Sequence, residues 1–260
     1  MLRPRVIPCL LVRRGGLVKT RKFKDDKYVG DPINAVRIFN EKEADELIVL
    51  DIDASADRRE PDYAMIAHLA EECRMPLCYG GGVTSVEQAK RIMSLGVEKV
   101  ALSSGALAKP TVISEIAEQV GRQSVVVVLD VKKTLLGRYR VFTNNGRMDT
   151  GRSPIDYSRE FERLGAGEIV LNSIDLDGAM TGYDLLLARE LRSAVRVPIT
   201  LLGGAGSYGD LTAAAQDLGI VGLAAGSLFV FKGPYRAVLI SYLSHAQRAS
   251  LLTTIQAAAH

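Results

Sequence analysis

Two glycine-rich turns have the composition of phosphate-binding loops. The first is residues 80–82 (Gly-Gly-Gly) and the second is residues 203–206 (Gly-Gly-Ala-Gly). Each follows a short apolar run and precedes an amphipathic stretch, an order that predicts a strand, a turn and a helix. Glycine lets the backbone approach a ligand closely, and the free N–H groups at a helix start favour an anion. The repetition predicts one phosphate site in each half of the chain, although a single such turn can be glycine-rich for steric reasons alone.

Each glycine turn is followed by a second turn of small residues. These are residues 102–105 (Leu-Ser-Ser-Gly) and 225–228 (Ala-Gly-Ser-Leu). The two pairs of turns predict a ligand held from two sides. The phosphate-binding candidates are Gly81, Gly82, Ser103, Ser104, Asp177, Gly178, Gly203, Gly204, Gly226 and Ser227.

Asp130 is the candidate for acid–base chemistry. It ends the apolar run 125–129 and precedes Val-Lys-Lys. A carboxyl group at the end of a buried strand is partly desolvated, which raises its pKa towards values useful for proton transfer. An aspartate at a strand end can also cap a helix or bind a loop, so both interpretations stay open for Asp130.

Strand-like and helical patterns alternate eight times along the chain. The strands are near-continuous apolar runs, as expected for a parallel sheet covered on both faces. We therefore predict an α/β fold, a single (β/α)8 TIM barrel, with an open doubly wound sheet as the alternative. The predicted strands are 6–12, 47–53, 75–79, 99–103, 124–130, 168–172, 199–202 and 221–225, and the predicted helices are 32–42, 62–72, 85–95, 110–120, 154–164, 183–194, 207–218 and 235–256.

The two halves of the chain repeat each other. The segment 48–51 (Ile-Val-Leu-Asp) matches 169–172 (Ile-Val-Leu-Asn), and Gly81-Gly82 matches Gly203-Gly204. This indicates an internal half-barrel duplication within one domain spanning 1–260, with halves of roughly 1–121 and 122–260. Residues 137–151 form a predicted hairpin excursion with its turn at 144–146 (Asn-Asn-Gly).

Composition excludes several classes of function. The 260 residues carry a net charge of only +3, which gives no reason to expect nucleic acid as a partner. No apolar run reaches 18 residues, and the N-terminal residues lack a signal-peptide pattern, so we expect no membrane span and a cytoplasmic protein. The three cysteines show no metal-ligand spacing, and we expect reduced thiols with neither metal nor cofactor.

The motifs together resemble the cyclase subunit of imidazole glycerol phosphate synthase, HisF. The resemblance runs from Arg5 to about Phe231, nearly the whole chain. Its motifs are residues 7–10 (Ile-Pro-Cys-Leu), 30–32, 44–47, 50–52, 80–82, 98–100, 129–132 (Leu-Asp-Val-Lys), 165–169, 175–178 (Asp-Leu-Asp-Gly) and 203–206.

The resemblance implies a barrel that receives ammonia from a HisH-like glutaminase docked on its bottom face. It also implies a substrate with a phosphate at each end. The family's ammonia gate is a ring of alternating charges, which corresponds here to Arg5, Glu46, Lys99 and Glu168. Asp45 and Glu98 complete the implied docking face. Without the resemblance, these charges would be interpreted as scattered surface ion pairs.

The chain departs from the family at position 11. The family has an aspartate there, which pairs with the one corresponding to Asp130 for ring closure, and this chain has Leu11. Leucine carries no proton, so the two-carboxylate mechanism is incomplete. Leu202, Ala179 and Ser103 are further departures from the family pattern near the same end of the barrel.

The first hypothesis is a HisF-like synthase subunit of a glutamine amidotransferase that conducts ammonia and lacks normal cyclase activity. It resembles the paralogues of surface-polysaccharide pathways, in which a third enzyme amidates a sugar. The alternative is an active cyclase, a lyase of histidine biosynthesis that uses Asp130 alone. A scaffold that only activates the glutaminase and a phosphoribosyl isomerase are further alternatives, so whether the chain is itself an enzyme stays open.

Overall fold

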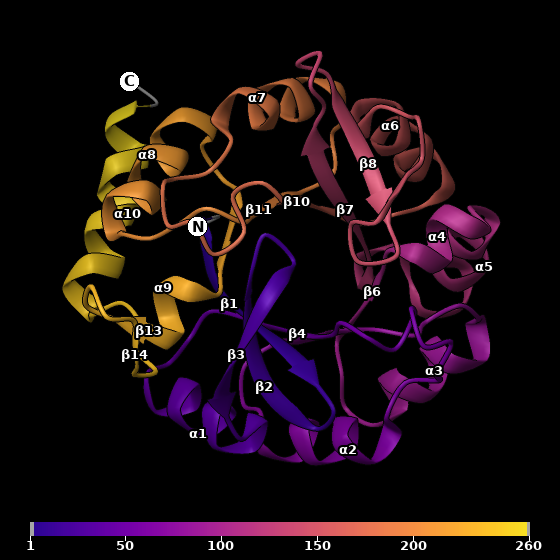
Figure 1. Cartoon of the computed structure of the whole chain (residues 1–260), viewed down its shortest axis with the longest axis horizontal. Helices are drawn as coiled ribbons and strands as arrows, with labels where there is room; N and C mark the ends of the chain where they lie inside the picture. The colour runs from indigo at the N-terminus through magenta and orange to yellow at the C-terminus, as the bar shows by residue number, and fades with distance from the viewer. Residues whose placement is uncertain (1–2, 259–260) are drawn as a thin grey trace.

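The computed structural model describes residues 3–258, and within them eight parallel strands form a closed barrel (Figure 1). The barrel closes because its first and last strands pair with each other in parallel. The pairing begins with Arg5 opposite Gly222 and ends with Pro8 opposite Ala225. The predicted (β/α)8 barrel is confirmed. Its strands, in hydrogen-bonding order, are β1 (Arg5–Arg13), β4 (Leu47–Asp51), β5 (Leu77–Gly80), β6 (Lys99–Leu102), β7 (Val125–Lys133), β10 (Glu168–Ser173), β11 (Ile199–Leu202) and β12 (Gly222–Ala225).

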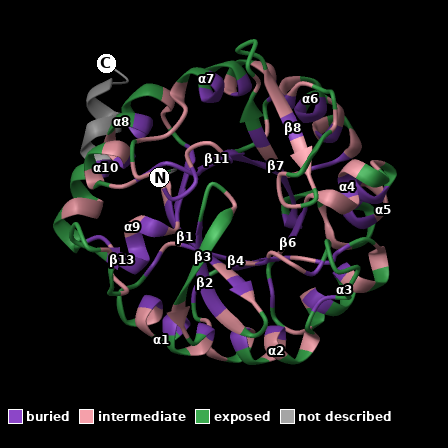
Figure 2. Cartoon of the chain, in the orientation of Figure 1, coloured by how far each residue is buried: buried purple, intermediate pink, exposed green. Residues whose placement is uncertain are grey.

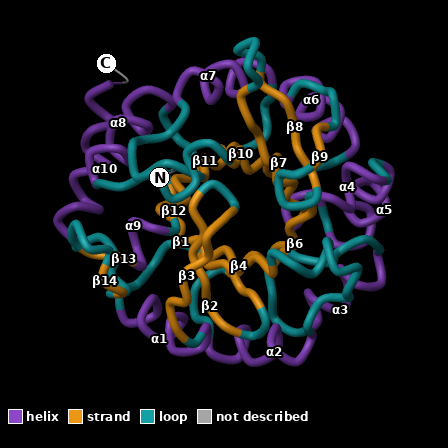
Figure 3. Tube along the Cα trace, in the orientation of Figure 1, coloured by secondary structure: helices purple, strands orange, loops and turns teal. Residues whose placement is uncertain are grey.

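Helices surround the barrel on the outside (Figure 3). Several begin where the sequence predicts, because Asp31, Ser85 and Ser207 each accept a hydrogen bond from the first turn of the helix that follows. The helices are α1 (Pro32–Glu41), α2 (Tyr63–Glu72), α3 (Val86–Ser94), α4 (Ser104–Ala108), α5 (Thr111–Val120), α6 (Pro154–Leu164), α7 (Leu185–Ala194), α8 (Tyr208–Leu218), α9 (Ser227–Val230) and α10 (His245–Ala258), with a 3-10 turn at Arg122–Ser124.

The core has two layers, one inside the barrel and one between the strands and the helices. Strand β7 contributes to both layers. Its residues Val125, Val127 and Leu129 face the helices, and Val126 and Val128 face the barrel interior. Both faces are buried, as Figure 2 shows for the strands. This explains why the strands are apolar throughout rather than alternating.

Two hairpins leave the ends of barrel strands. Strands β2 (Gly16–Arg21) and β3 (Lys24–Gly30) continue from β1 and lie over the barrel opening (Figure 1). This hairpin was not predicted, because seven of its 15 residues are charged and its apolar residues do not alternate regularly. Strands β8 (Tyr139–Thr143) and β9 (Met148–Asp149) confirm the predicted hairpin after β7.

The last predicted helix is wrong over its first ten residues. Instead of a helix from Tyr235, the chain forms a hairpin of β13 (Phe231–Lys232) and β14 (Ala237–Val238), and α10 begins only at His245. Gly233 (φ +73°) and Arg236 (φ +51°) have left-handed backbone conformations that a helix does not allow. The side chain of Arg236 donates to the Gly178 carbonyl and to Ser227 Oγ.

The described residues contain no helix that is long and apolar enough to span a membrane. Residues 3–258 likewise contain no cluster of three or more histidine, cysteine, aspartate or glutamate side chains that could hold a metal ion.

Candidate functional site

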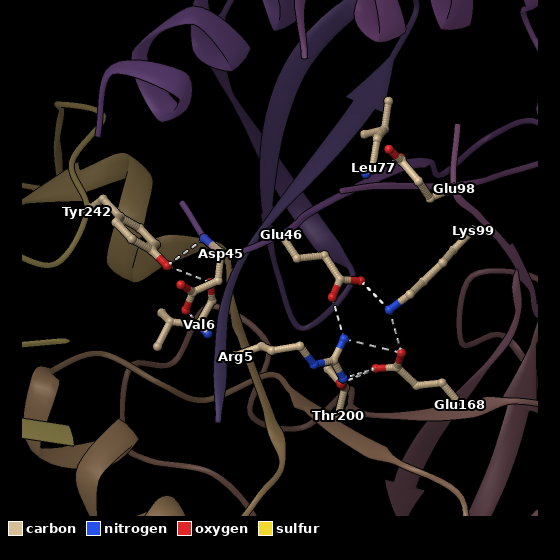
Figure 4. A network of polar contacts seen from close by, with 10 residues as sticks. All are labelled: Arg5, Val6, Asp45, Glu46, Leu77, Glu98, Lys99, Glu168, Thr200 and Tyr242. Atoms are coloured by element: carbon tan, nitrogen blue, oxygen red, sulfur yellow. Dashed lines mark hydrogen bonds and ion pairs between the residues drawn. The ribbon is translucent and has the colours of Figure 1, made fainter. Parts of the chain in front are cut away.

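Four charged side chains meet on the axis at the amino-terminal end of the barrel (Figure 4). Arg5 opens β1, Glu46 precedes β4, Lys99 opens β6 and Glu168 opens β10. The Lys99 ammonium lies 2.7 Å from Glu46 Oε1 and 2.9 Å from Glu168 Oε2, and Arg5 Nη2 lies 2.8 Å from Glu168 Oε1. Arg5 also pairs with Glu46, so the ring is closed with alternating signs. The structure therefore brings together the four predicted residues, which we call the charged ring; its role as an ammonia gate stays a prediction.

The carboxylates of the charged ring are the most buried of its groups. The side chains of Glu46 and Glu168 are 4% and 6% exposed. Burial alone would raise the pKa of Glu168, but Arg5 and Lys99 outweigh that effect and lower it to about 2. The pKa values of Arg5 and Lys99 are raised despite burial, because both cations face the two glutamates. Glu168, Arg5 and Lys99 are therefore charged at neutral pH, and the ring joins two basic side chains to two acidic ones.

Thr200 is a fifth member that the sequence analysis missed. Its hydroxyl donates to Glu168 Oε1 at 2.5 Å, and the residue is fully buried on β11. Gly222 on the neighbouring strand makes room for it, because a Cβ there would collide with Thr200 Oγ1. The available signal was a single polar residue within the apolar strand 199–202.

Asp45 and Glu98 of the predicted docking face are occupied by the barrel itself. Asp45 Oδ2 accepts a hydrogen bond from the Val6 amide at 2.9 Å, and Glu98 Oε2 accepts one from the Leu77 amide at 2.7 Å (Figure 4). Both carboxylates thus satisfy a backbone donor at the start of a neighbouring strand, since Val6 is the second residue of β1 and Leu77 the first of β5. Their principal contacts are structural, although they lie beside the charged ring.

The barrel interior beyond the charged ring is apolar. Two thiols belong to this lining, and burial raises the pKa of Cys9 to about 12 and raises that of Cys78 as well, so both are neutral at pH 7. A small neutral molecule would meet no charged group along this lining. The buried side chains are Ile7, Cys9, Ile48, Cys78, Ala101, Val126, Val128, Val170, Leu202 and Ala224.

A pocket opens at the carboxyl ends of the strands, where (β/α)8 barrels carry their sites. We call it the mouth pocket. Asp130 and Leu11 line it, and so does every predicted phosphate-binding residue. The latter are Gly81, Gly82, Ser103, Ser104, Asp177, Gly178, Gly203, Gly204, Gly226 and Ser227.

Asp130 is the candidate acid–base residue of the mouth pocket. Burial raises its pKa to about 7, against the stabilising hydrogen bond that its Oδ1 accepts from Asn172 Nδ2 at 2.7 Å. Ser103 Oγ lies 3.5 Å from its other oxygen. Leu11, half-buried, packs with Leu50 against the apolar interior and offers no proton. The pocket thus has a carboxyl group of raised pKa at Asp130 and an apolar wall at Leu11.

This pKa predicts how stability depends on pH. An aspartate ordinarily titrates near 3.8, whereas Asp130 titrates near 7 in the folded protein. Between these values the folded state binds the extra proton, so the free energy of unfolding falls as pH rises from 4 to 7. We expect Asp130→Asn to gain stability relative to wild type over that window, by on the order of 2–4 kcal/mol at pH 8. Urea titrations at pH 4.5 and pH 8 measure this, and parallel curves for the two proteins would contradict it.

Residues of the β2–β3 hairpin bind the carboxylate of Asp177 at the mouth pocket. Lys19 Nζ lies 2.5 Å from Asp177 Oδ1, and Thr20 Oγ1 and the Phe23 amide donate to Oδ2 at 2.7 and 3.2 Å. Gly226 permits this arrangement, because a Cβ there would lie 2.8 Å from Lys19 Cε. Sequence reasoning missed Lys19 because it missed the hairpin that carries it.

The fold and its pocket define a (β/α)8-barrel protein with a ligand pocket at the carboxyl ends of its strands. Residues 5–235 match the family model described as histidine biosynthesis protein, and the chain belongs to that family. A Leptospira interrogans protein named "Putative imidazole glycerol phosphate synthase subunit HisF" is 59% identical over 252 residues, 96% of this chain and 99% of its own length. A Vibrio vulnificus (strain YJ016) protein named "Putative imidazole glycerol phosphate synthase subunit hisF3" is 57% identical over 253 residues, 97% of this chain and 97% of its own length. The Imidazole glycerol phosphate synthase subunit HisF of Alkaliphilus metalliredigens (strain QYMF) is 42% identical over 81% of this chain and 83% of its own. The chain is thus a HisF-like synthase subunit.

Proposed function

We propose that this HisF-like subunit takes ammonia from a HisH-like glutaminase docked over the charged ring, and conducts it through the barrel without normal cyclase activity. One contrast carries the proposal. The charged ring is complete and closed, whereas the mouth pocket has Leu11 where the two-carboxylate mechanism needs an acid.

The apolar interior supports a conduit for ammonia. Ammonia is small and uncharged, and the side chains beyond the charged ring are aliphatic groups and neutral thiols. Such a lining excludes bulk water and offers no strong acid that would convert ammonia to ammonium. The charged ring closes the end that faces the partner.

The ammonia acceptor is assigned from the paralogues that the chain resembles. We propose a third enzyme that amidates a nucleotide-linked acetamido sugar of a surface polysaccharide. The mouth pocket then holds a phosphorylated small molecule against its glycine turns. Two relatives, at 54% and 57% identity, carry the names hisF2 and hisF3.

A second candidate is a working cyclase of histidine biosynthesis. The observation that favours it is Asp130, whose pKa of about 7 suits one residue that both donates and accepts a proton. A cyclase assay decides between the two candidates. It mixes the purified protein with the phosphoribulosyl substrate and an ammonium salt. We expect no imidazole product above background, and normal turnover would reject the proposal.

A charge reversal at Lys99 tests the conduit directly. We expect Lys99→Glu to open the charged ring, because three carboxylates would then surround Arg5. With the glutaminase bound, glutamine hydrolysis should continue while ammonia escapes into solution instead of reaching the acceptor enzyme. A barrel that served only as a scaffold would keep hydrolysis and transfer in constant ratio. Lys109→Glu, in an exposed ion pair with Glu115, is the matched control.

A further inference from the structure

The turn between β7 and β8 has apolar residues at positions where polar ones are usual. Residues 134–137 (Thr-Leu-Leu-Gly) form a β-turn, in which the Gly137 amide donates to the Thr134 carbonyl at 2.9 Å. Leu135 is fully exposed, and Leu136 is 85% exposed. Surface turns favour Gly, Asn, Asp and Ser, because an apolar side chain there gains nothing from packing. The fold itself therefore gives no reason for two leucines in this turn.

The turn projects away from the barrel. It extends past α7 beyond the ring of helices (Figure 1), and residues 135–138 are all exposed (Figure 2). Two hydrogen bonds fix its shape, since the Thr134 amide donates to the Arg138 carbonyl at 2.8 Å and the Arg138 amide donates to Thr134 Oγ1 at 3.2 Å. The leucines are thus presented at the end of an ordered arm, where another surface can reach them.

Four basic side chains flank the two leucines. None of the four forms an ion pair with any residue in the range 3–258, and the segment 131–148 contains no aspartate or glutamate. Two of the cations lie over the rings of Phe142 and Tyr139, and a third donates to the Gly151 carbonyl. The four are Lys132, Lys133, Arg138 and Arg140.

Two carboxylates lie beside one residue pair of this hairpin. Asp175 Oδ2 accepts a hydrogen bond from the Lys133 amide at 2.9 Å. Asp184 lies beside Tyr139, which pairs with Lys133, and burial together with this carboxylate raises the pKa of Tyr139 to about 12. These acids offset positive charge at that pair. The remaining cations are Arg138, directly after the turn, and the pair of Lys132 with Arg140, and they keep the end of the hairpin basic.

Apolar side chains at a protruding tip, with cations on both sides, fit the surface of an anionic membrane. The leucines would enter the acyl region while the cations stay level with the lipid phosphates. A nucleic acid would use the cations and leave the leucines in water. A specific protein interface buries at least about 1,000 Å², far more than a tip of two leucines supplies. A membrane surface uses both features of the turn and needs no further contact area.

We propose that the β7–β8 turn attaches this protein to an anionic membrane surface, with Leu135 and Leu136 inserted between the lipids. Lys132, Arg138 and Arg140 bind the phosphates around them. The attachment is peripheral and reversible, because it rests on two side chains and a few charges. It goes beyond the proposed function and does not depend on it. The hairpin continues from the carboxyl end of β7, so this attachment turns the mouth pocket towards the membrane and leaves the charged ring free for a partner.

Sedimentation of the full-length chain with lipid vesicles tests the proposal. We expect binding to phosphatidylcholine vesicles that contain about one-quarter phosphatidylglycerol, and none to phosphatidylcholine alone. Binding should fall when sodium chloride is raised from about 0.1 M to about 0.5 M, because salt screens the attraction. Leu135→Ser combined with Leu136→Ser should weaken binding at least about tenfold. Lys132→Gln combined with Arg138→Gln should weaken it about 20-fold, since each cation near the surface contributes about fivefold.

Matched control variants lie away from the turn. Ile220→Ser changes an exposed apolar residue just before β12, at the opposite end of the barrel. Arg74→Gln combined with Lys90→Gln removes two exposed cations at α2 and α3. Both should leave vesicle binding within about twofold, because these side chains lie more than a Debye length, about 10 Å at 0.1 M salt, from the bound membrane.

A fluorescent reporter shows whether the turn itself enters the lipid. The chain contains no tryptophan, so Leu136→Trp introduces a single one. We expect its emission to shift to shorter wavelength on addition of the anionic vesicles and to be quenched by brominated lipids. Ile220→Trp should show neither change.

Three outcomes would overturn the proposal. They are no binding to anionic vesicles at low salt, binding that survives both double variants, and an unshifted emission of Leu136→Trp on bound vesicles. If vesicles do not bind and the double leucine variant instead lowers ammonia transfer to the acceptor enzyme, the turn belongs to a protein interface. These measurements use the barrel without a glutaminase. Failure of ammonia transfer would leave them unaffected, and their failure would leave the conduit untouched.

Discussion

Replacement of Arg5 by methionine is expected to lower the free energy of unfolding by about 3–5 kcal/mol, the largest stability effect of any substitution considered for this barrel. Arg5 contacts both Glu46 and Glu168, whose side chains are almost completely buried. Without it, two buried carboxylates would share the single ammonium of Lys99. Urea unfolding at pH 7 measures the loss.

The pH profile of the same variant separates lost charge pairing from lost packing. The pKa of Glu168 is about 2 in the folded protein, against an ordinary 4.5, so its pairing stabilises the fold above pH 4.5 and is lost as pH falls towards 2. We expect Arg5→Met to approach wild-type stability on acidification. Arg189→Met, from an exposed pair, should cost less than about 1 kcal/mol. A loss at Arg5 of similar size at every pH would show that packing alone is responsible.

Leu11→Asp is the second substitution with a large expected effect. It places a carboxyl group on the wall of the mouth pocket, which Asp130 also lines. General acid–base catalysis contributes about 100-fold to 10000-fold, so we expect imidazole formation to rise at least 100-fold above the wild-type background with ammonium as the nitrogen source. Product is measured by its absorbance or by mass spectrometry.

Two control variants test whether the gain in imidazole formation comes from proton transfer by the new carboxyl group. Leu11→Asn has nearly the same shape as Leu11→Asp but transfers no proton, and the double variant Leu11→Asp with Asp130→Asn removes the partner. Both should stay at background. If Leu11→Asp itself gives no product, the block lies with Leu202, Ala179 or Ser103, where the pocket also departs from the family pattern.

The barrel itself could be predicted because its strands have no exposed face. Apolar runs such as 125–129 pack on helices outside and on one another inside, and that double burial leaves a clear pattern in the sequence. Most helix starts were also predicted, because a capping Ser or Asp is a local signal. The charged ring had no local signal. Its members are far apart in sequence, and only the family resemblance joined them before the structure did.

The missed residues belong to segments whose conformation depends on distant contacts. The β2–β3 hairpin is rich in charged residues, and it is ordered by pairing with β1 and by the contacts of Lys19 and Thr20 with Asp177, which lies 158 and 157 residues away from them. Residues 235–244 contain enough apolar side chains to resemble a helix, yet the left-handed backbone of Gly233 and Arg236 turns them into a hairpin. Arg236 reaches Ser227 only because of that turn.

The two sides of the charged ring are not equally fixed. Glu168 is bound by Arg5, Lys99 and the hydroxyl of Thr200, whereas among residues 3–258 Glu46 is bound by Arg5 and Lys99 only. When Lys99 withdraws, Glu168 keeps two partners and Glu46 keeps one. If the charged ring is the proposed ammonia gate, we therefore expect it to open on the side of β4 and β6, while Glu168 stays attached to the β10–β11 wall through Thr200.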